Sequence, residues 1–179
     1  MSRTRRNNKI DLKAEPPGFG FEIGNCVCNV YLKKLVYGEK GDVKYLRLSF
    51  LKDNKWINKY IRFEPKQNFE DEESYKKHKI TVQESLENLM SVYLSKENIL
   101  YVIKRSKGLD FKGYIKSIIY ELKDKKYWEK PICIKVIPED DGGRTVGKYP
   151  PFMNKMENKN FILKYSFYEL NKYSKNFKK

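Results

Sequence analysis

The chain has 179 residues, of which 38 are Lys or Arg and 23 are Asp or Glu, so its formal net charge is +15. This length suffices for one domain with a hydrophobic core, and a hydrophobic content of 40% supports folding. No apolar run approaches the ~20 residues of a membrane span. Met1–Lys13 is charged from its first residues, so we expect neither a membrane partner nor a secretory signal.

The positive charge favours a polyanionic partner, of which nucleic acid is the commonest. The alternative is a Lys-rich surface that only keeps the protein soluble. Against this alternative stands an aromatic content of 15%, including 14 Tyr. This exceeds what one modest core requires, because a buried Tyr hydroxyl needs a partner.

Both ends of the chain differ in composition from the middle. Residues 1–13 contain five basic residues and a single acid, Asp11. This predicts a flexible basic arm over residues 1–20, in which Pro16-Pro17-Gly18 precedes the body. We expect one domain over residues 21–170 and a basic, frayed tail over residues 171–179.

The first half of the body predicts three strands, at residues 26–36, 43–51 and 55–63. The connections contain Gly38 and Gly41, and then Asp53-Asn54, which are turn residues. A meander of antiparallel strands is therefore expected.

These strands alternate between two kinds of side chain with a period of two, which is typical of half-buried strands. One set is apolar and is expected to form the core: Val30, Leu32, Leu46, Leu48, Phe50, Ile57, Ile61 and Phe63. The other set combines rings with positive charges: Tyr31, Lys33, Tyr45, Arg47, Trp56, Tyr60 and Arg62. Rings beside cations suit the stacking of bases and the neutralisation of phosphates.

A charged loop is expected from Glu64 to Lys79, followed by a helical insert over residues 80–125. Thr81 with Glu84 fits a capping box. Ser95 can cap a second helix, which Gly108 terminates. Asp110 can cap a third helix with a clear apolar stripe.

After the helices, Pro131–Ile137 predicts a strand, Asp140–Gly143 a turn, and Phe161–Phe167 a strand that closes the sheet. Strands, a helical insert and further strands predict an α+β fold. The specific expectation is a small OB-like β-barrel with a helical insertion between the third and fourth strands. An open sheet backed by helices fits the same pattern.

The Val27–Phe50 block, the helical middle, Cys133–Ile137 and Lys148–Met153 (KYPPFM) resemble single-stranded DNA-binding proteins of tailed bacteriophages. The resemblance covers residues 22–165. It implies an OB-type fold and sequence-tolerant binding of single strands in phage replication or recombination, in the cytoplasm of the infected bacterial host. Many such proteins recruit replication partners through an acidic tail. This chain ends in Lys178 and Lys179, so recruitment by that route is not expected.

We therefore expect single-stranded DNA as the partner, with RNA as an alternative and replication or recombination proteins as further partners. The candidate binding residues are Tyr31, Lys33, Tyr45, Arg47, Trp56, Tyr60, Arg62, Arg144, Lys148, Tyr149 and Phe152. Two interpretations of Tyr149–Phe152 stay open. The segment is either a rigid aromatic lip on the binding groove or a proline-stiffened plug over the barrel end.

The three cysteines, Cys26, Cys28 and Cys133, lie in strand-like apolar runs. An odd number favours core thiols in a reducing compartment. Cys26-x-Cys28 is too tight a spacing for a zinc site, and the single His78 has no partner nearby in the sequence, so no metal is expected.

Asp110 with Glu121 and Lys123 has the spacing of a metal-dependent nuclease. The competing interpretation is that Asp110 caps a helix that contains Glu121, whereas the nuclease motif needs its Glu-x-Lys on a strand. We therefore expect no enzyme and no cofactor. A basic virion, structural or interaction protein that contacts packaged DNA is the other alternative.

Overall fold

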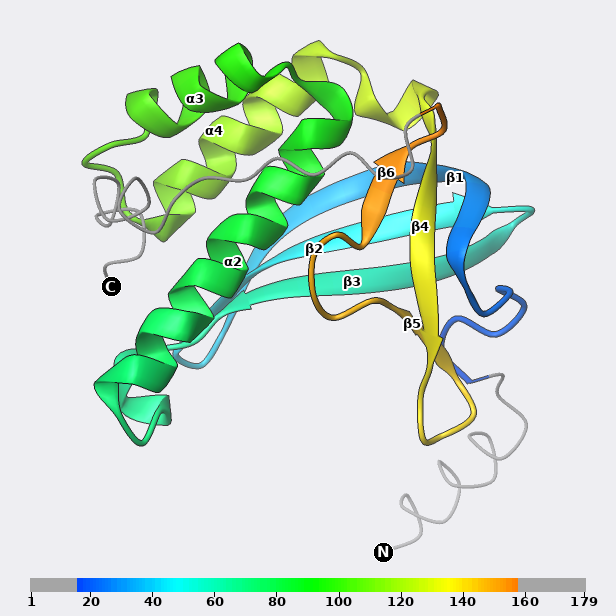
Figure 1. Ribbon diagram of the computed structural model, residues 1–179, viewed down its shortest axis with the longest axis horizontal. Coiled ribbons are helices and arrows are strands. Elements are labelled where there is room, and N and C mark those ends of the chain that lie inside the picture. Colours follow the sequence, from blue (N-terminus) through cyan, green and yellow to red (C-terminus); the bar gives the residue numbers. More distant parts are fainter. Residues whose placement is uncertain (1–15, 158–179) are drawn as a thin grey trace, which may run out of the picture.

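The computed structural model describes residues 16–157 and shows an antiparallel, nearly closed barrel with three α-helices (Figure 1). Three strands come first: β1 (Gly24–Lys40), β2 (Val43–Lys52) and β3 (Lys55–Phe63). The helices are α2 (Glu72–Tyr93), α3 (Lys96–Arg105) and α4 (Phe111–Asp124). Three strands end the described chain: β4 (Pro131–Pro138), β5 (Arg144–Val146) and β6 (Met153–Lys155). Single 3-10 turns, η1 (Lys66–Asn68) and η2 (Tyr127–Glu129), flank the helices.

The strand order is β3-β2-β1-β4-β5, and β6 also pairs with β4. The long strand β1 pairs with β4 through its first half and with β2 through its second half. Strands β3 and β5 contact each other without forming a hydrogen-bonded ladder, which leaves an open seam in the barrel. The predicted α+β fold, an OB-like barrel with a helical insertion between the third and fourth strands, is confirmed.

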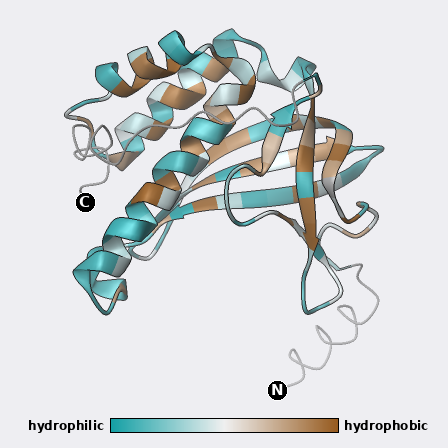
Figure 2. Cartoon of the chain, in the orientation of Figure 1, coloured by the Kyte–Doolittle hydropathy of each residue, from teal (hydrophilic) through white to brown (hydrophobic). Residues whose placement is uncertain are grey.

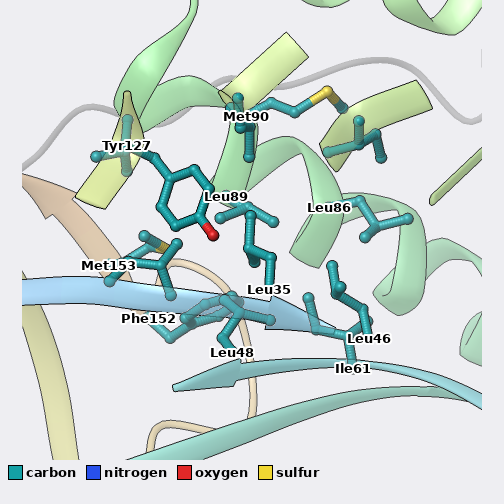
Figure 3. Packing of buried hydrophobic residues seen from close by; sticks show 14 of the residues in the cluster. Leu35, Leu46, Leu48, Ile61, Leu86, Leu89, Met90, Tyr127, Phe152 and Met153 are labelled. Atoms are coloured by element: carbon teal, nitrogen blue, oxygen red, sulfur yellow. The ribbon is translucent and has the colours of Figure 1, made fainter. Parts of the chain in front are cut away.

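The apolar side of β1–β3 packs against the helices, as the sequence pattern predicts (Figure 2). Figure 3 shows Leu46, Leu48 and Ile61 pointing toward Leu86 and Leu89 of α2. Burying one such side chain contributes roughly 1.5–3 kcal/mol. The opposite side of these strands is therefore left outside this core.

Helix α2 begins earlier than the sequence predicts. Its N-cap is Asp71, whose carboxylate accepts a hydrogen bond from the Ser74 backbone N–H. Thr81 lies inside the helix, and its hydroxyl donates to the Lys77 carbonyl, so the predicted capping box at Thr81 is wrong. Residues 72–79 are helical, so the expected loop is wrong there. The first two turns of the helix are polar and carry little apolar periodicity, so the sequence pattern does not reveal them. Acids in the first turn also suit the positive end of the helix dipole.

The other two helix starts are confirmed. Ser95 accepts a hydrogen bond from the Asn98 N–H at the start of α3, and Asp110 accepts one from the Gly113 N–H at the start of α4. No helix of the described chain is long and apolar enough to span a membrane.

Strands β5 and β6 lie along the same edge of β4. Between their ladders, the Gly147 N–H donates to the Lys135 carbonyl, and the Lys135 N–H donates to the Phe152 carbonyl. They therefore act as one long strand from which residues 148–151 loop out. This four-residue excursion, Lys148–Pro151, includes a cis peptide bond between Pro150 and Pro151.

Asn88 of α2 fixes the chain where this excursion returns. Its side-chain oxygen accepts hydrogen bonds from the Phe152 and Met153 N–H groups, and its Nδ2 donates to the Met153 carbonyl. Phe152 is only 1% exposed and belongs to the core. One buried amide thus ties the helical insert to the last strand of the barrel.

The described chain begins with a turn that packs on the β4–β5 hairpin. The Arg144 N–H donates to the Pro17 carbonyl, and Gly18, with φ +69°, lies so close to the Arg144 carbonyl that a Cβ would collide with it. Residues 16–20 therefore belong to the body rather than to the predicted arm. The rest of the arm, the expected strand Phe161–Phe167 and the C-terminal tail lie outside the described residues.

The prediction of three core thiols is wrong. Cys28 and Cys133 form a disulfide between β1 and β4. Cys133 is buried, but Cys26 is an exposed free thiol. A break in the β1–β4 register between Val27 and Val30 turns Cys28 toward Cys133, and strand alternation alone does not reveal such a break.

Candidate nucleic-acid interface

The outer side of β1–β3 carries the predicted rings and cations in register. One row across the sheet contains Arg47 opposite Tyr60, and the next contains Tyr45 opposite Arg62. Trp56 lies further along β3 on the same side, because it is separated from Tyr60 by four residues. The structure therefore brings together five of the residues that the sequence singled out.

A β-bulge changes which lysine of β1 joins this face. The β1–β2 register shifts between Leu32 and Lys34, so Lys33 is the extra residue. Lys34 takes the outer position, and its ammonium lies 5.2 Å from the centroid of the Trp56 ring. The sequence pattern does not single out Lys34, because uninterrupted alternation places it on the inner side.

Tyr31 and Lys33 lie close to each other, with the Lys33 ammonium 4.9 Å from the Tyr31 ring centroid. The same ammonium donates a hydrogen bond to the Trp128 carbonyl at 3.0 Å. Both residues are half-buried. Lys33 is therefore held by the protein itself, which distinguishes it from Lys34 on the open face.

The aromatic rings of the outer face are exposed but held in place. Trp56 is 45% exposed and Tyr60 is 36% exposed. Tyr45 and Tyr60 make an edge-to-face contact with centroids 5.5 Å apart, and the Arg62 guanidinium lies 4.8 Å from the Tyr60 ring. Gly38, opposite Tyr45 on β1, leaves room for the Tyr45 ring, which a Cβ at that position would hit.

A groove of about 690 Å³ runs along the open seam between β3 and the β4–β5 hairpin. One wall is the outer side of β3, and the other is formed by the hairpin and the Pro17-Gly18 turn. Its lining combines rings, cations, one amide and two acids: Trp56, Tyr60, Arg62, Arg144, Lys148, Asn58, Glu139 and Asp141 among others. The groove connects the exposed rings of β3 with two predicted cations from the far end of the sequence.

Lys59 lies on the inner side of β3, at the edge of this groove, and was not recognised as a site residue. Its ammonium donates hydrogen bonds to the carbonyls of Gly147 (2.9 Å) and Lys148 (3.2 Å), and it lies 4.6 Å from the Phe152 ring centroid. Burial, with a smaller contribution from the nearby Arg62, lowers the pKa of Lys59 to about 8. Lys59 therefore holds the start of the 148–151 excursion against β3.

The two open interpretations of the Tyr149–Phe152 segment apply to different residues. Tyr149 is 71% exposed, so its ring is available at the surface near the groove. Phe152 is buried in the core, so the prediction that it contacts nucleic acid is wrong for the structure described. The excursion thus presents one ring outward and anchors itself with the other.

Three arginines of the interface have no acidic partner in the part of the chain that the structure describes. Among residues 16–157, Arg47, Arg62 and Arg144 form no ion pair. The buried Nε atoms of Arg47 and Arg144 also lack a hydrogen-bond partner within this part of the chain. Asp141, one of the two acids of the groove, accepts a hydrogen bond from the Gly143 N–H, which turns it toward its own hairpin.

The carboxylates of the nuclease alternative have structural partners. Asp110 caps α4, and Glu121, on the same helix, forms an ion pair with Arg105 at 2.8 Å. The interpretation of Asp110 as a helix cap is confirmed. Within the described chain, the one group of at least three side chains suited to holding a metal ion is formed by the cysteines.

Fold and surface together define an OB-like barrel with an aromatic and cationic outer face. Comparisons with protein-family models, curated proteins and solved structures found no match for this chain. The resemblance to phage single-stranded DNA-binding proteins therefore stays a prediction.

Proposed function

We propose that the protein binds single-stranded DNA without sequence preference, on the outer face of β1–β3 and in the adjoining groove. The observation that carries this proposal is the register of β2 and β3. It aligns aromatic rings with Arg47 and Arg62, which form no ion pair among residues 16–157, on one surface. Phage replication or recombination is the process in which we place this activity, because of the sequence resemblance.

Lys34, Arg47 and Arg62 attract the phosphates, and bases then stack on the rings of Trp56 and Tyr60. Stacking contributes ~1–3 kcal/mol per base and tolerates any sequence, because every base has a π face. A duplex hides its base faces, so the same surface binds it through phosphates alone. No chemical step is involved.

The proposal is tested by competition between single-stranded DNA, duplex DNA and RNA of equal length, at salt concentrations from 0.05 to 0.3 M. We expect single-stranded DNA to bind most tightly, with a log–log salt slope of roughly 0.7 per phosphate contact. Equal affinity for duplex and single strand in 0.15 M salt contradicts the proposal. That result favours the alternative of a basic structural protein that contacts packaged DNA.

The position of the site is tested with a matched pair of tryptophans. Trp56 is exposed on the outer face, whereas Trp128 packs against the core. Fluorescence quenching on binding should disappear in Trp56→Phe and persist in Trp128→Phe. Trp56→Ala should weaken binding by about 5- to 150-fold, which corresponds to ~1–3 kcal/mol. Quenching that depends on Trp128 places the site elsewhere.

A further inference from the structure

Four sulfur atoms gather where β1, β4 and β6 meet. The Cys26 Sγ lies 3.4 Å from the Cys28 Sγ, and Cys28 is bonded to Cys133. The Cys133 Sγ lies 3.5 Å from the Met156 Sδ. The Sγ atoms of the three cysteines all lie within 4.8 Å of one another. The spacing Cys26-x-Cys28 alone gives no sign of this cluster, because Cys133 is 105 residues away from Cys28 in the sequence.

The backbone around the cluster is shaped to bring these atoms together. Asn29, in the break of the β1 register, has a left-handed conformation with φ 58°. Its N–H lies 3.5 Å from the Met156 Sδ, in hydrogen-bonding geometry. Pairing of Cys133 with Asn154 places Met156 just beyond β6, beside the cluster. Bulges of this kind re-aim side chains and are common near functional sites.

We propose that the reduced chain binds one Cu(I) ion through the thiolates of Cys26, Cys28 and Cys133, with the Met156 thioether as a fourth ligand. This inference does not depend on nucleic-acid binding.

The spacing of the sulfur atoms fits a single ion. With metal–sulfur bonds of ~2.3 Å, as for Zn–S, sulfurs around one ion are about 3.8–4.0 Å apart. The Cys26 and Cys28 Sγ atoms lie 3.4 Å apart, and no two Sγ atoms of the group are farther apart than 4.8 Å. The bonded Cys28 and Cys133 sulfurs have to separate by side-chain rotation once the disulfide is open. Thiolate and thioether ligands are soft and select Cu(I) over hard cations.

Binding of Cu(I) by all three cysteines requires a thiol reductant that first opens the disulfide. A dithiol reduces the Cys28–Cys133 disulfide to two thiols and is itself oxidised to a disulfide. Binding of Cu(I) then releases three protons from the three thiols. The resulting complex has a net negative charge. Lys52, whose ammonium donates a hydrogen bond to the Cys28 carbonyl at 2.8 Å, provides a nearby positive charge. The oxidised chain keeps the disulfide and retains only one free thiol among these three cysteines.

The test uses the full chain, reduced under anaerobic conditions and titrated with Cu(I) against a chromophoric chelator such as bicinchoninate. We expect the reduced chain to remove one equivalent of Cu(I), and the oxidised chain to remove none. Cys26→Ser keeps the disulfide partners and should weaken Cu(I) binding by at least ~10–100-fold, the loss typical even of outer-shell changes. Met156→Leu removes the sulfur at roughly the same side-chain volume and should also weaken binding.

A second measurement does not depend on how well a variant folds. Alkylation followed by mass spectrometry should label all three cysteines in the reduced wild-type chain, and Cu(I) should protect all three. Equal labelling with and without Cu(I) overturns the proposal, as does a Cys26→Ser variant that binds Cu(I) as tightly as the parent. In either case the cluster is a structural disulfide beside a free thiol.

Discussion

The two sides of the β1–β3 sheet have the same backbone and the same ladders but differ in what their side chains contact. The inner side places Leu46, Leu48 and Phe50 against helices and strands, with no exposed surface. The outer side places the half-buried Tyr45 and Arg47 and the exposed Tyr60 away from this core, and Arg47 forms no ion pair among residues 16–157. If our proposed function is right, stability and nucleic-acid binding depend on alternate residues of the same strands, and each can be changed without the other.

The largest expected difference between the sides is in stability. Leu48→Ala should lower the free energy of unfolding by ~2–5 kcal/mol, because it leaves a cavity in a fully packed core. Trp56→Ala on the outer side should change it by less than about 0.5 kcal/mol. Urea unfolding of both variants measures this contrast. If Trp56→Ala proves the more destabilising, the two sides have been assigned the wrong way round.

Asn88→Ala tests a polar residue on the inner side. The substitution leaves the N–H groups of Phe152 and Met153 and the Met153 carbonyl without their side-chain partner. Since an unsatisfied buried group costs about 1–3 kcal/mol, we expect a loss of roughly 2–4 kcal/mol in unfolding free energy. Glu84→Ala, at an exposed position of the same helix, is the control and should have almost no effect. Equal stability of the two variants shows that the amide does not anchor the segment.

Lys59 is a charged residue on the inner side, and its pKa of about 8 makes stability depend on pH. In the unfolded chain Lys has a pKa near 10.4, so between these values the unfolded state binds more protons. Stability should therefore rise by about 1–2 kcal/mol from pH 7.5 to 9.5 and fall as pH drops through 8. In Lys59→Met, the free energy of unfolding should rise less over this pH range. Chemical unfolding of both proteins between pH 7.5 and 9.5 measures the difference. An unchanged slope in the variant assigns the rise to other groups.

Gly38→Ala is expected to have only a small effect on stability, and it tests whether the position of the Tyr45 ring matters for binding. A methyl group at this position meets the Tyr45 ring, which must rotate away from the sheet. We expect a stability change below about 1 kcal/mol, as for a surface substitution. Affinity for single-stranded DNA should fall several-fold, because Tyr45 and Tyr60 no longer form one surface. Retained affinity excludes Tyr45 from the interface. Gly41→Ala is the control. No atom lies close to the added methyl group there, so this variant measures only the effect of replacing a glycine at a turn with φ +59°.

The division of the sheet into two sides was predictable because alternation with a period of two needs only local sequence. Leu46, Leu48, Ile57 and Ile61 were assigned to the core and are buried there. The bulge at Lys33 was not predictable, because an extra residue leaves no trace in composition. Lys34 therefore takes the outer position that alternation assigns to Lys33, and it lies over Trp56.

Features that depend on distant parts of the chain were also missed. The disulfide joins Cys28 to Cys133 across 105 residues, and Lys59 finds its partners in Gly147 and Lys148. Neither pairing has a local signal. The polar start of α2 was missed for a different reason, since a helix that does not yet face the core has no apolar stripe. The Asp71 cap, with acids directly after it, was the signal available.

The excursion at residues 148–151 leaves and rejoins a single barrel edge, and it is fixed on both sides by contacts that do not involve its tip. Lys59 holds the entry, and Asn88 holds the exit. Chain length at the tip is therefore independent of the barrel, so residues can be inserted or exchanged beside Tyr149 while every core side chain keeps its position. A family of proteins built on this barrel could change its reach over the groove by editing these four residues alone. The same position is where a foreign recognition peptide can be grafted next to the groove.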